Sequence, residues 1–282
     1  MKTTAGRILT EAAARLTAGG VEEPALNAQW LLADATGVER LRLLAEPDTL
    51  VAPAALKKFR AGLLQKEQGL PLAYILGWQD FMGLRINVDK RVLVPRPETE
   101  ELAGHAADFL LGRKGDLSVL DYGSGSGAIG LWLARRFPAL RVTGVEISAR
   151  AINCSADNAR ELGVADRVKF VKGSTLAAVR GPFDAIVSNP PYIPTGVIPG
   201  LAPEVLSEPR VALDGGGDGL DVARMLVRLA PARLKKGGAM IMELGGGQAP
   251  RLLAAMPAAV WTGKKTFKDL CGVERFLFAR KK

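Results

Sequence analysis

The sequence is poor in the residues that build metal sites and disulfide frameworks. Its 282 residues include one histidine, His105, and two cysteines, Cys154 and Cys271, which are far apart in the chain. Two isolated cysteines argue against a disulfide framework and against a zinc site built on cysteine. A metal site would then need carboxylates for nearly all its ligands, so we expect no metal. His105 falls in an expected helix over 99–111, and we expect it to be an exposed helix residue.

Long apolar stretches are also missing. Although 48% of the residues are hydrophobic, no run of about 18 apolar residues occurs that would predict a membrane-spanning helix. The segment from Met1 to Arg15 has no apolar stretch typical of a signal peptide. The length fits one full domain plus a small one. We therefore expect a globular, cytoplasmic protein with no membrane partner.

The chain is basic, but its positive charge is not concentrated in one place. A formal net charge of +9 and a pI near 9.7 raise the question of nucleic-acid binding. The lysines and arginines are scattered, and their small clusters, such as Lys264-Lys265 and Arg280-Lys281-Lys282, do not alternate with aromatic residues. A solvated surface explains each cluster, so we expect no direct nucleic-acid substrate.

A stiff polar turn follows an apolar stretch in the second half of the chain. Residues 183–188 predict a buried strand, and Asn189-Pro190-Pro191-Tyr192 comes directly after it. Proline fixes φ and has no N–H, so two in succession make a rigid loop whose carbonyls stay unpaired. The Asn189 side-chain oxygen and the Pro190 carbonyl are then acceptors for both hydrogens of a planar NH2 group, and Tyr192 can lie against that group. The alternative is an ordinary turn, because Asn-Pro and Pro-Pro are common turn signals.

A glycine-rich turn joins an expected strand at 117–121 to an expected helix at 128–136. It reads Gly123-Ser124-Gly125-Ser126-Gly127, with Asp121 just before it. Glycine at such a turn lets a ligand approach the backbone and aims free N–H groups at it. The next expected strand, 141–145, ends in Glu146, at the spacing expected for binding a ribose diol.

The order of glycines and the position of Asp121 favour one cofactor over another. The pattern is G-x-G-x-G and differs from the G-x-G-x-x-G of dinucleotide-binding proteins. A carboxylate directly before the turn disfavours a pyrophosphate and suits a cationic amino-acid group. These features favour S-adenosyl-L-methionine over NAD.

Together these motifs resemble those of class I methyltransferases that modify amino groups on planar systems. Two more stretches, VPRPETE at 94–100 and EPRVALDGG at 208–216, are similar to those of the peptide chain release factor glutamine N5-methyltransferases. The similarity runs from about residue 70 to the C-terminus. It implies S-adenosyl-L-methionine as the cofactor and release factors as the protein substrate, partners that themselves work on the ribosome.

The resemblance also implies which residues form the site. Where many relatives carry an acidic residue for the adenine amine, this chain has Ser174, followed by Thr175, so a hydroxyl or backbone contact is expected there. Relatives place the segment before residue 100 beside the cofactor, which adds Phe81, Arg96 and Thr99 as candidates. The expected cofactor contacts are Asp121, Gly123, Ser124, Gly125, Ser126, Gly127, Glu146, Ser174, Thr175 and Asn189, and the expected substrate contacts are Asn189, Pro190, Pro191 and Tyr192, of which Asn189, Pro190 and Tyr192 are the expected catalytic residues.

Alternating strands and helices predict a doubly wound α/β sheet of the class I methyltransferase kind, with its ligand at the carboxyl ends of the strands. Beyond the elements above, we expect helices at 149–162 and 218–234, strands at 167–171 and 238–243, and a closing hairpin strand at 267–278. Apolar residues at helical spacing over 8–16, after Pro24 and over 52–68 predict a small helical bundle.

Three domains are expected from this reading. They are a helical substrate-docking domain at 1–70, a β-hairpin linker at 71–97 with strands 84–88 and 91–94, and the methyltransferase domain at 98–282. The glycine- and proline-rich segment up to Gly219 is expected to be an ordered lid. Gly246-Gly247-Gln248 repeats the tripeptide that the family methylates, and a coincidence in a turn explains it better than self-modification.

The expected reaction is direct transfer of the sulfonium methyl to the side-chain amide nitrogen of a glutamine. Three alternatives stay open at this point. An adenine-N6 methyltransferase uses the same Asn-Pro-Pro-Tyr motif, but base flipping calls for a target-recognition region that the chain does not obviously contain. A ribosomal-protein glutamine methyltransferase is closer. A binding module with a degenerate methyltransferase fold is disfavoured, because both motifs are intact.

Overall fold

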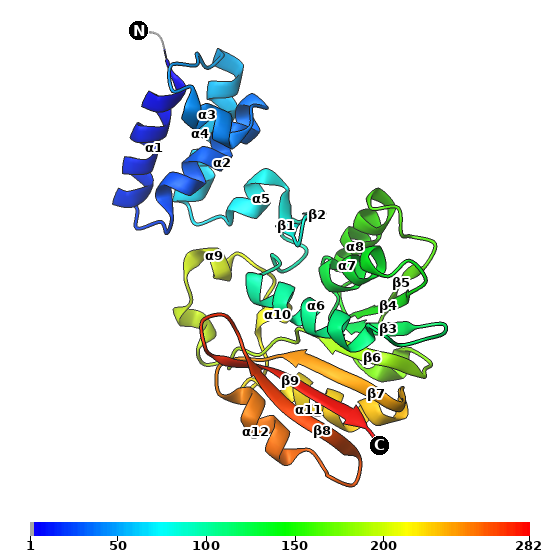
Figure 1. Cartoon of the computed structure of the whole chain (residues 1–282). Coiled ribbons are helices and arrows are strands. Elements are labelled where there is room, and N and C mark those ends of the chain that lie inside the picture. Colours follow the sequence, from blue (N-terminus) through cyan, green and yellow to red (C-terminus); the bar gives the residue numbers. More distant parts are fainter. Residues whose placement is uncertain (1–2) are drawn as a thin grey trace. The chain divides into compact units, whose positions relative to one another are not determined.

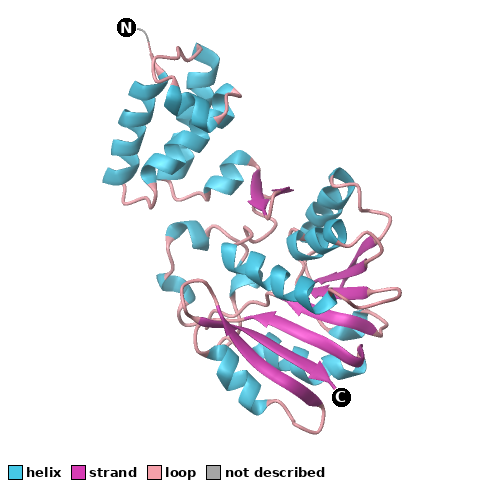
Figure 2. Cartoon of the chain, viewed as in Figure 1, coloured by secondary structure: helices cyan, strands magenta, loops and turns pink. Residues whose placement is uncertain are grey.

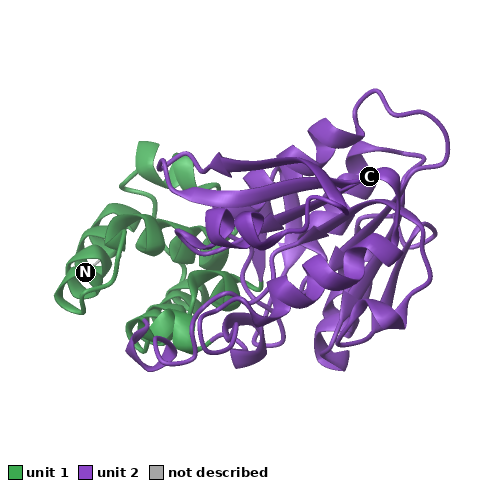
Figure 3. Ribbon diagram, turned by 90° about the horizontal axis from the view of Figure 1, so that it is seen from below, with its two compact units in different colours: residues 1–77, 202–207 green, residues 78–201, 208–282 purple. Residues whose placement is uncertain are grey.

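The computed structural model describes residues 3–282, and the chain forms two compact units. Unit 1 comprises Met1–Gly77 and the short segment Ala202–Ser207, and unit 2 comprises Trp78–Leu201 and Glu208–Lys282 (Figure 3). The chain therefore leaves unit 2 after Leu201 and returns to it at Glu208. Within residues 3–282, every helix is too short or too polar to cross a membrane.

Unit 1 is a bundle of helices around one apolar core. Its helices are α1 (Ala5–Ala18), α2 (Pro24–Thr36), α3 (Arg40–Ala45), α4 (Pro53–Glu67), α5 (Leu72–Leu76) and α9 (Pro203–Leu206). Proline at the first position of α2 and α4 fits a helix start, where no N–H is needed. Leu16, Leu32 and Phe59 are buried between the helices. The three helices expected from apolar spacing are confirmed as α1, α2 and α4.

Segment Ala202–Ser207 is held in unit 1 by specific contacts. Lys66, only 3% exposed, donates from Nζ to Glu204 Oε1 at 2.5 Å. The Ser207 hydroxyl donates to the Gly69 carbonyl at 3.2 Å. A buried lysine needs such a partner, because an unpaired charge inside a protein is strongly unfavourable. These bonds make α9 a fixed part of the helical unit.

Unit 2 is built on a seven-stranded mixed sheet with the order β5-β4-β3-β6-β7-β9-β8 (Figure 2). The first five strands in this order are parallel, and β9 is antiparallel to both β7 and β8. The strands are β3 (Ser118–Tyr122), β4 (Arg141–Glu146), β5 (Val168–Lys172), β6 (Phe183–Ser188), β7 (Leu234–Glu243), β8 (Trp261–Lys268) and β9 (Glu274–Lys281). The central strand β6 is buried along its whole length, as an internal parallel strand requires.

Helices cover both faces of this sheet (Figure 1). One side carries α6 (Pro97–Leu110), α7 (Ala128–Arg136) and α8 (Ala149–Glu161), and the other carries α11 (Asp221–Leu229) and α12 (Gln248–Ala255). Leu226 of α11 and Leu252 of α12 pack in one core with Ile186 and Met240 of the sheet. The short helix α10 (Arg210–Leu213) lies in the β6–β7 connection. The predicted doubly wound α/β fold is confirmed.

The expected hairpin was wrong in one of its strands. Strand β2 (Leu84–Asn87) is present, but it pairs with β1 (Trp78–Phe81), and residues 91–94 form no strand. The turn lies at Met82-Gly83, where both residues have positive φ, as a two-residue hairpin turn of this twist requires. At Val94 the backbone N–H donates to the Glu208 carboxylate, so it takes no part in a ladder.

The bounds of two other elements and the exposure of one side chain also differ from the prediction. The helix expected at 218–234 begins at Asp221 and passes into a 3₁₀ turn at Ala230–Ala232, because Pro231 cannot continue the α-helical hydrogen bonds. The closing element at 267–278 is two paired strands, β8 and β9. His105, expected to be exposed, is half-buried, and its ring stacks on Phe267 with centroids 4.6 Å apart.

Asn158 of α8 connects the end of β2 to the glycine-rich turn. Its Nδ2 donates to the carbonyls of Ser126 at 2.9 Å and Asn87 at 3.0 Å, and its Oδ1 accepts from the Asn87 N–H at 2.9 Å. The residue is 1% exposed. Backbone groups at two separate segments therefore depend on one buried amide.

We expect Asn158→Ala to destabilise unit 2 by about 1–3 kcal/mol, because it leaves buried backbone groups without partners. Asn153→Ala is the matched control, since Asn153 is exposed on the same helix and has the same helix propensity. Urea denaturation followed by circular dichroism measures the difference. Equal free energies of unfolding in the two variants would contradict the role given to Asn158.

Candidate active site

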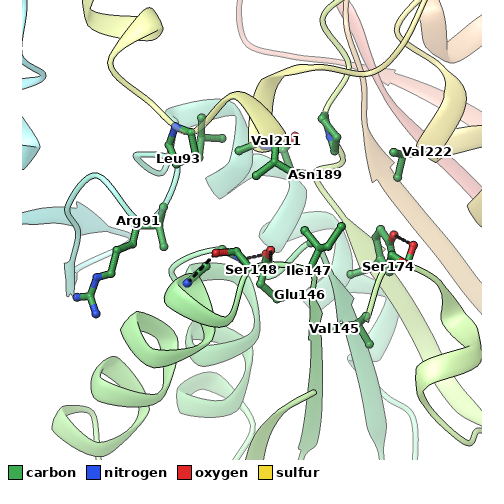
Figure 4. A pocket seen from close by; sticks show the side chains of 18 of the residues that line it. Arg91, Leu93, Val145, Glu146, Ile147, Ser148, Ser174, Asn189, Val211 and Val222 are labelled. Atoms are coloured by element: carbon green, nitrogen blue, oxygen red, sulfur yellow. Dashed lines mark hydrogen bonds between the residues drawn. The ribbon is translucent and has the colours of Figure 1, made fainter. Parts of the chain in front are cut away.

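An open pocket lies at the carboxyl ends of the parallel strands of unit 2 (Figure 4). It encloses about 820 Å³, counting the space at its mouth, a size typical of small-molecule sites. Its lining comes from the ends of β3, β4, β5 and β6 and from two loops: Arg91, Val92, Leu93, Tyr122, Gly123, Gly125, Val145, Glu146, Ile147, Ser148, Ala151, Gly173, Ser174, Asn189, Pro191, Pro209, Val211, Ala212 and Val222.

The order of the strands explains why the pocket is here. From β3 the chain proceeds to β4 and β5 on one side, then returns to place β6 on the other side of β3. Loops that leave neighbouring strands at such a switch point diverge and open a crevice. Tyr122 at the end of β3 is opposite Ser188 at the end of β6, and the Ser188 hydroxyl donates to the Tyr122 carbonyl at 2.8 Å. The two motifs expected to form one site therefore begin side by side.

The glycine-rich turn needs glycine for conformation and for space. Gly123, Gly125 and Gly127 all have positive φ, which other residues adopt only with strain. A side chain at Gly127 would lie 2.9 Å from Leu131, and one at Gly123 would point toward the Asn189 carbonyl at 3.9 Å. Gly123 and Gly125 line the pocket. The turn therefore exposes backbone without side chains to the pocket at these two residues.

Glu146 ends β4 and lines the pocket, yet it is only 8% exposed. Its Oε2 accepts from the Gly125 N–H at 3.0 Å and its Oε1 from the Ser148 N–H at 2.9 Å (Figure 4). Each carboxylate oxygen retains a further acceptor position. Two oxygens fixed in this way fit a vicinal diol, so Glu146 has the geometry expected for a ribose ligand.

Asp121 lies deeper than expected. It is 1% exposed and does not line the pocket. Its Oδ2 accepts from the Gly130 N–H at 3.0 Å, and no described residue donates to its Oδ1. The pKa of this carboxyl is raised to about 7, chiefly by burial and also by the negative charge of Glu146, while the hydrogen bond from the Gly130 N–H opposes the shift. An unpartnered carboxylate oxygen behind a glycine turn fits a cationic ligand group.

The end of β5 and the residue after Glu146 form the remaining wall. Ser174 lines the pocket, and its carbonyl accepts from the Tyr122 hydroxyl at 2.7 Å. Thr175, also expected at the site, instead caps the following 3₁₀ turn by accepting from the Ala177 N–H at 3.2 Å. Ile147 is 48% exposed in the pocket, and an exposed apolar side chain there suits the face of a flat ring. Ser124, Ser126 and Gly127 support the turn without lining the pocket.

Among the described residues, the Asn-Pro-Pro-Tyr loop has two acceptors without a hydrogen-bond donor. Asn189 Nδ2 donates to the Thr99 hydroxyl at 2.9 Å, and neither the Asn189 Oδ1 nor the Pro190 carbonyl accepts a hydrogen bond from any residue in 3–282. Asn189 and Pro191 line the pocket, and Pro190 and Tyr192 do not. The Tyr192 hydroxyl lies 3.4 Å from Glu243 Oε1, and burial raises its pKa.

Gln248, the third residue of the internal Gly-Gly-Gln tripeptide, has a structural role. It is 7% exposed, and its Nε2 donates to the Tyr192 carbonyl at 2.9 Å and the Asp218 carbonyl at 3.2 Å. Its Oε1 accepts from the Gly245 N–H at 2.8 Å. This amide therefore fixes the end of the Asn-Pro-Pro-Tyr loop and the start of α11, which agrees with the interpretation that the tripeptide is a coincidence.

Some residues that line the pocket were not predicted from the sequence. Arg91 and Leu93 lie before α6, and Val211 and Ala212 lie in α10 (Figure 4). The motifs at 94–100 and 208–216 could have indicated these residues, because Glu208 of the second motif bonds to residues of the first. Glu208 is 4% exposed, accepts from the Val94 N–H at 2.9 Å and forms an ion pair with Arg96. Two candidates, Phe81 and Arg96, do not line the pocket.

Comparisons with known proteins agree with this geometry. A family model described as PrmC N-terminal domain matches residues 7–77, and one described as Methyltransferase small domain matches residues 106–223. A release factor glutamine methyltransferase of Moorella thermoacetica is 42% identical over 98% of this chain and 98% of its own, and one of Deinococcus radiodurans is 41% identical over 97% of each. The chain belongs to the release factor glutamine methyltransferase family.

Membership in this family confirms the predicted resemblance and the use of S-adenosyl-L-methionine by this enzyme. A solved structure of a ribosomal protein L11 methylase from Lactobacillus delbrueckii subsp. bulgaricus superposes with a TM-score of 0.51 and 21% identity, over 70% of this chain and 85% of that one. At this identity the likeness supports the fold alone. Gly123, Gly125, Glu146 and Ile147 line the pocket in which a cofactor would be expected to bind.

We expect Glu146→Ala to weaken binding of S-adenosyl-L-methionine by about 1.5–3 kcal/mol, through the loss of charge-assisted hydrogen bonds. Isothermal titration with the cofactor measures this. Glu161→Ala is the control, because it removes the same charge from an exposed position of unit 2 outside the pocket. If both variants bind the cofactor as the parent does, Glu146 does not hold the ribose.

Proposed function

We propose that this enzyme transfers a methyl group from S-adenosyl-L-methionine to the side-chain amide nitrogen of the glutamine in the Gly-Gly-Gln motif of peptide chain release factors. The relatives that carry this name match almost the whole chain. The observation that supports the reaction most directly is the pair of unpartnered acceptors, Asn189 Oδ1 and the Pro190 carbonyl, beside the glycine-rich turn.

The two acceptors address the difficulty of the chemistry. The lone pair of an amide nitrogen is delocalised into its carbonyl, so the nitrogen is a poor nucleophile. Asn189 Oδ1 and the Pro190 carbonyl each accept one N–H of the substrate amide and favour electron density on nitrogen as the new bond forms. Fixed positions of both reactants lower the barrier further, by about 7–11 kcal/mol in favourable cases.

Each part of the cofactor is assigned to residues whose positions fit it. Glu146 would hold the ribose hydroxyls, Ile147 and Ser174 would border the adenine, and the backbone of Gly123 and Gly125 would approach the amino-acid group. When bound, S-adenosyl-L-methionine supplies an electrophilic methyl carbon. Asp121 remains assigned to the cofactor's cationic group through its unpartnered Oδ1.

The reaction needs no strong base in the site. A methylated amide nitrogen that has given up its lone pair is acidic, and it releases its proton to water. Burial raises the pKa of the Tyr192 hydroxyl, so this group stays protonated and serves to pack against the flat amide. The absence of a histidine from the pocket lining is consistent with this scheme.

The substrate is protein rather than nucleic acid in this proposal. The helices of unit 1 are assigned to docking of the release factor, and the segments 71–97 and 98–282 to the linker and the methyltransferase domain, as the sequence predicts. A substrate that works on the ribosome agrees with the basic surface and with a cytoplasmic location.

One experiment separates the candidate substrates. The enzyme is incubated with cofactor labelled in its methyl group and, in parallel, with a bacterial release factor, ribosomal protein L11 and duplex DNA. We expect label in the release factor alone, on the glutamine of its Gly-Gly-Gln motif, as located by mass spectrometry of its peptides. Label in L11 or DNA, with none in the release factor, would replace the proposal with one of its alternatives.

We expect Asn189→Ala to lower kcat about 10²–10³-fold, which is the usual effect of removing one acceptor or donor aimed at the reacting group. The Kd for the cofactor should change less than about threefold, because Glu146 and the glycine turn remain. Steady-state kinetics with release factor and titration of the cofactor give the two quantities. Asn153→Ala serves as the control, and an unchanged kcat in Asn189→Ala would remove the assignment.

A further inference from the structure

A chain of hydrogen bonds runs from Asn189 away from the pocket. Asn189 Nδ2 donates to Thr99 Oγ1 at 2.9 Å, and the Thr99 hydroxyl donates to Glu243 Oε2 at 2.8 Å. Thr99 lies in the first turn of α6, and Glu243 is the last residue of β7. Thr99 is 5% exposed and Glu243 is 1% exposed. Nothing in the proposed reaction uses either residue directly.

The direction of each bond follows from what each group can do. An ionised carboxylate only accepts hydrogen bonds, so the single hydroxyl hydrogen of Thr99 is committed to Glu243. Thr99 Oγ1 can then only accept from Asn189. Asn189 must therefore turn its NH2 toward Thr99, which leaves its Oδ1 free for the pocket.

We propose that Glu243 and Thr99 are positioning residues that fix the Asn189 amide with its oxygen facing the substrate. The inference rests on the proposed function, since the reversed amide would offer hydrogen-bond donors to a substrate NH2 group and could not hold it. An amide in an open loop has two nearly equal orientations. The carboxylate selects one of them through the hydroxyl between the two groups.

The position of Glu243 supports a role beyond folding. Strand β7 is parallel to β6, and Met242 is opposite Ser188, so the carboxyl end of β7 lies directly behind the Asn-Pro-Pro-Tyr loop. A buried charge contributes little to stability compared with a packed apolar side chain. Arg275, the nearby cation, forms its hydrogen bond with Asp269 at 2.8 Å. Glu243 instead forms its two bonds with Thr99 and Tyr192, which flank the proposed substrate site.

The positioning of the Asn189 amide depends on the charge of Glu243. The groups that face its carboxyl are Glu98 from α6, Tyr192 from the loop and Arg275 from β9. The pKa of Glu243 is raised to about 7, chiefly by burial and also by the charge of Glu98, while the bonds from Thr99 and Tyr192 and the charge of Arg275 oppose the shift. A protonated Glu243 can donate to Thr99, and the hydroxyl of Thr99 is then free to donate to Asn189 Oδ1. Above about pH 7 the ionised Glu243 therefore keeps the Asn189 amide with its oxygen toward the substrate. Below about pH 7 the protonated Glu243 no longer selects this orientation.

The first test compares Thr99→Val with Thr99→Ser in the full-length enzyme, using a bacterial release factor as substrate. Valine keeps the shape of threonine but cannot accept from Asn189, and serine keeps the hydroxyl. We expect Thr99→Val to lower kcat at least tenfold with the Kd for cofactor within twofold, and Thr99→Ser to retain at least a third of the parent kcat. Thr262→Val, at an exposed position of β8, is the control.

The second test follows kcat against pH at saturating cofactor and release factor. We expect the kcat of the parent to fall at least threefold from pH 8 to pH 6. Glu243→Gln, which has no group to titrate there, should show a lower kcat at pH 8 and no such fall. Saturation with cofactor removes any contribution of Asp121 to cofactor affinity. Thermal unfolding and cofactor titration confirm that each variant is folded.

The outcomes separate this inference from the function on which it rests. If the parent enzyme does not label the release factor, the proposed function fails. If the parent is active and Thr99→Val keeps its kcat, or Glu243→Gln keeps the acid fall of the parent, the positioning role is overturned while the function stands.

Discussion

The site depends on the parallel pairing of β3 with β6. This pairing places Tyr122 opposite Ser188, and the Ser188 hydroxyl closes the end of the pair on the Tyr122 carbonyl. The residues that follow each strand must then diverge from one point, one into the glycine turn and the other into the Asn-Pro-Pro-Tyr loop. A register shift of one residue would turn every side chain of β6 to the opposite face and move Asn189 out of the pocket. The relative positions of the glycine turn and the Asn-Pro-Pro-Tyr loop therefore depend on backbone hydrogen bonds inside the sheet.

Buried carboxylates form a second constraint around this crevice. Asp121, Glu146 and Glu243 lie at or near the carboxyl ends of β3, β4 and β7, and none is more than 8% exposed. The pKa of Asp121 and that of Glu243 are both raised to about 7, chiefly by burial, so the charged form of each carboxyl is costly in its buried surroundings. A cationic ligand group beside Asp121 would relieve that cost, which couples cofactor binding to ionisation.

The sequence predicts several residues that line the pocket, but it does not predict the residues that support them. Asn189, Glu146 and the glycine turn stand in short local motifs whose chemistry can be read residue by residue. Glu243 and Gln248 could not be found in this way, because they are distant in the chain and act only through β7 and α12 being adjacent to the loop. The wrong hairpin strand at 91–94 has a similar cause. The Val94 N–H donates to the Glu208 carboxylate, a partner far along the chain that local propensity cannot indicate.

Gln248 shows why a tripeptide alone cannot define the substrate. Its amide already has both hydrogens on backbone carbonyls, those of Tyr192 and Asp218. This is the arrangement that the proposed mechanism requires of the substrate glutamine, with one carbonyl from the same loop. Gln248 is nevertheless only 7% exposed and does not line the pocket. Holding an amide by two acceptors is therefore common structural chemistry, and it becomes catalytic only where a methyl donor can reach the nitrogen.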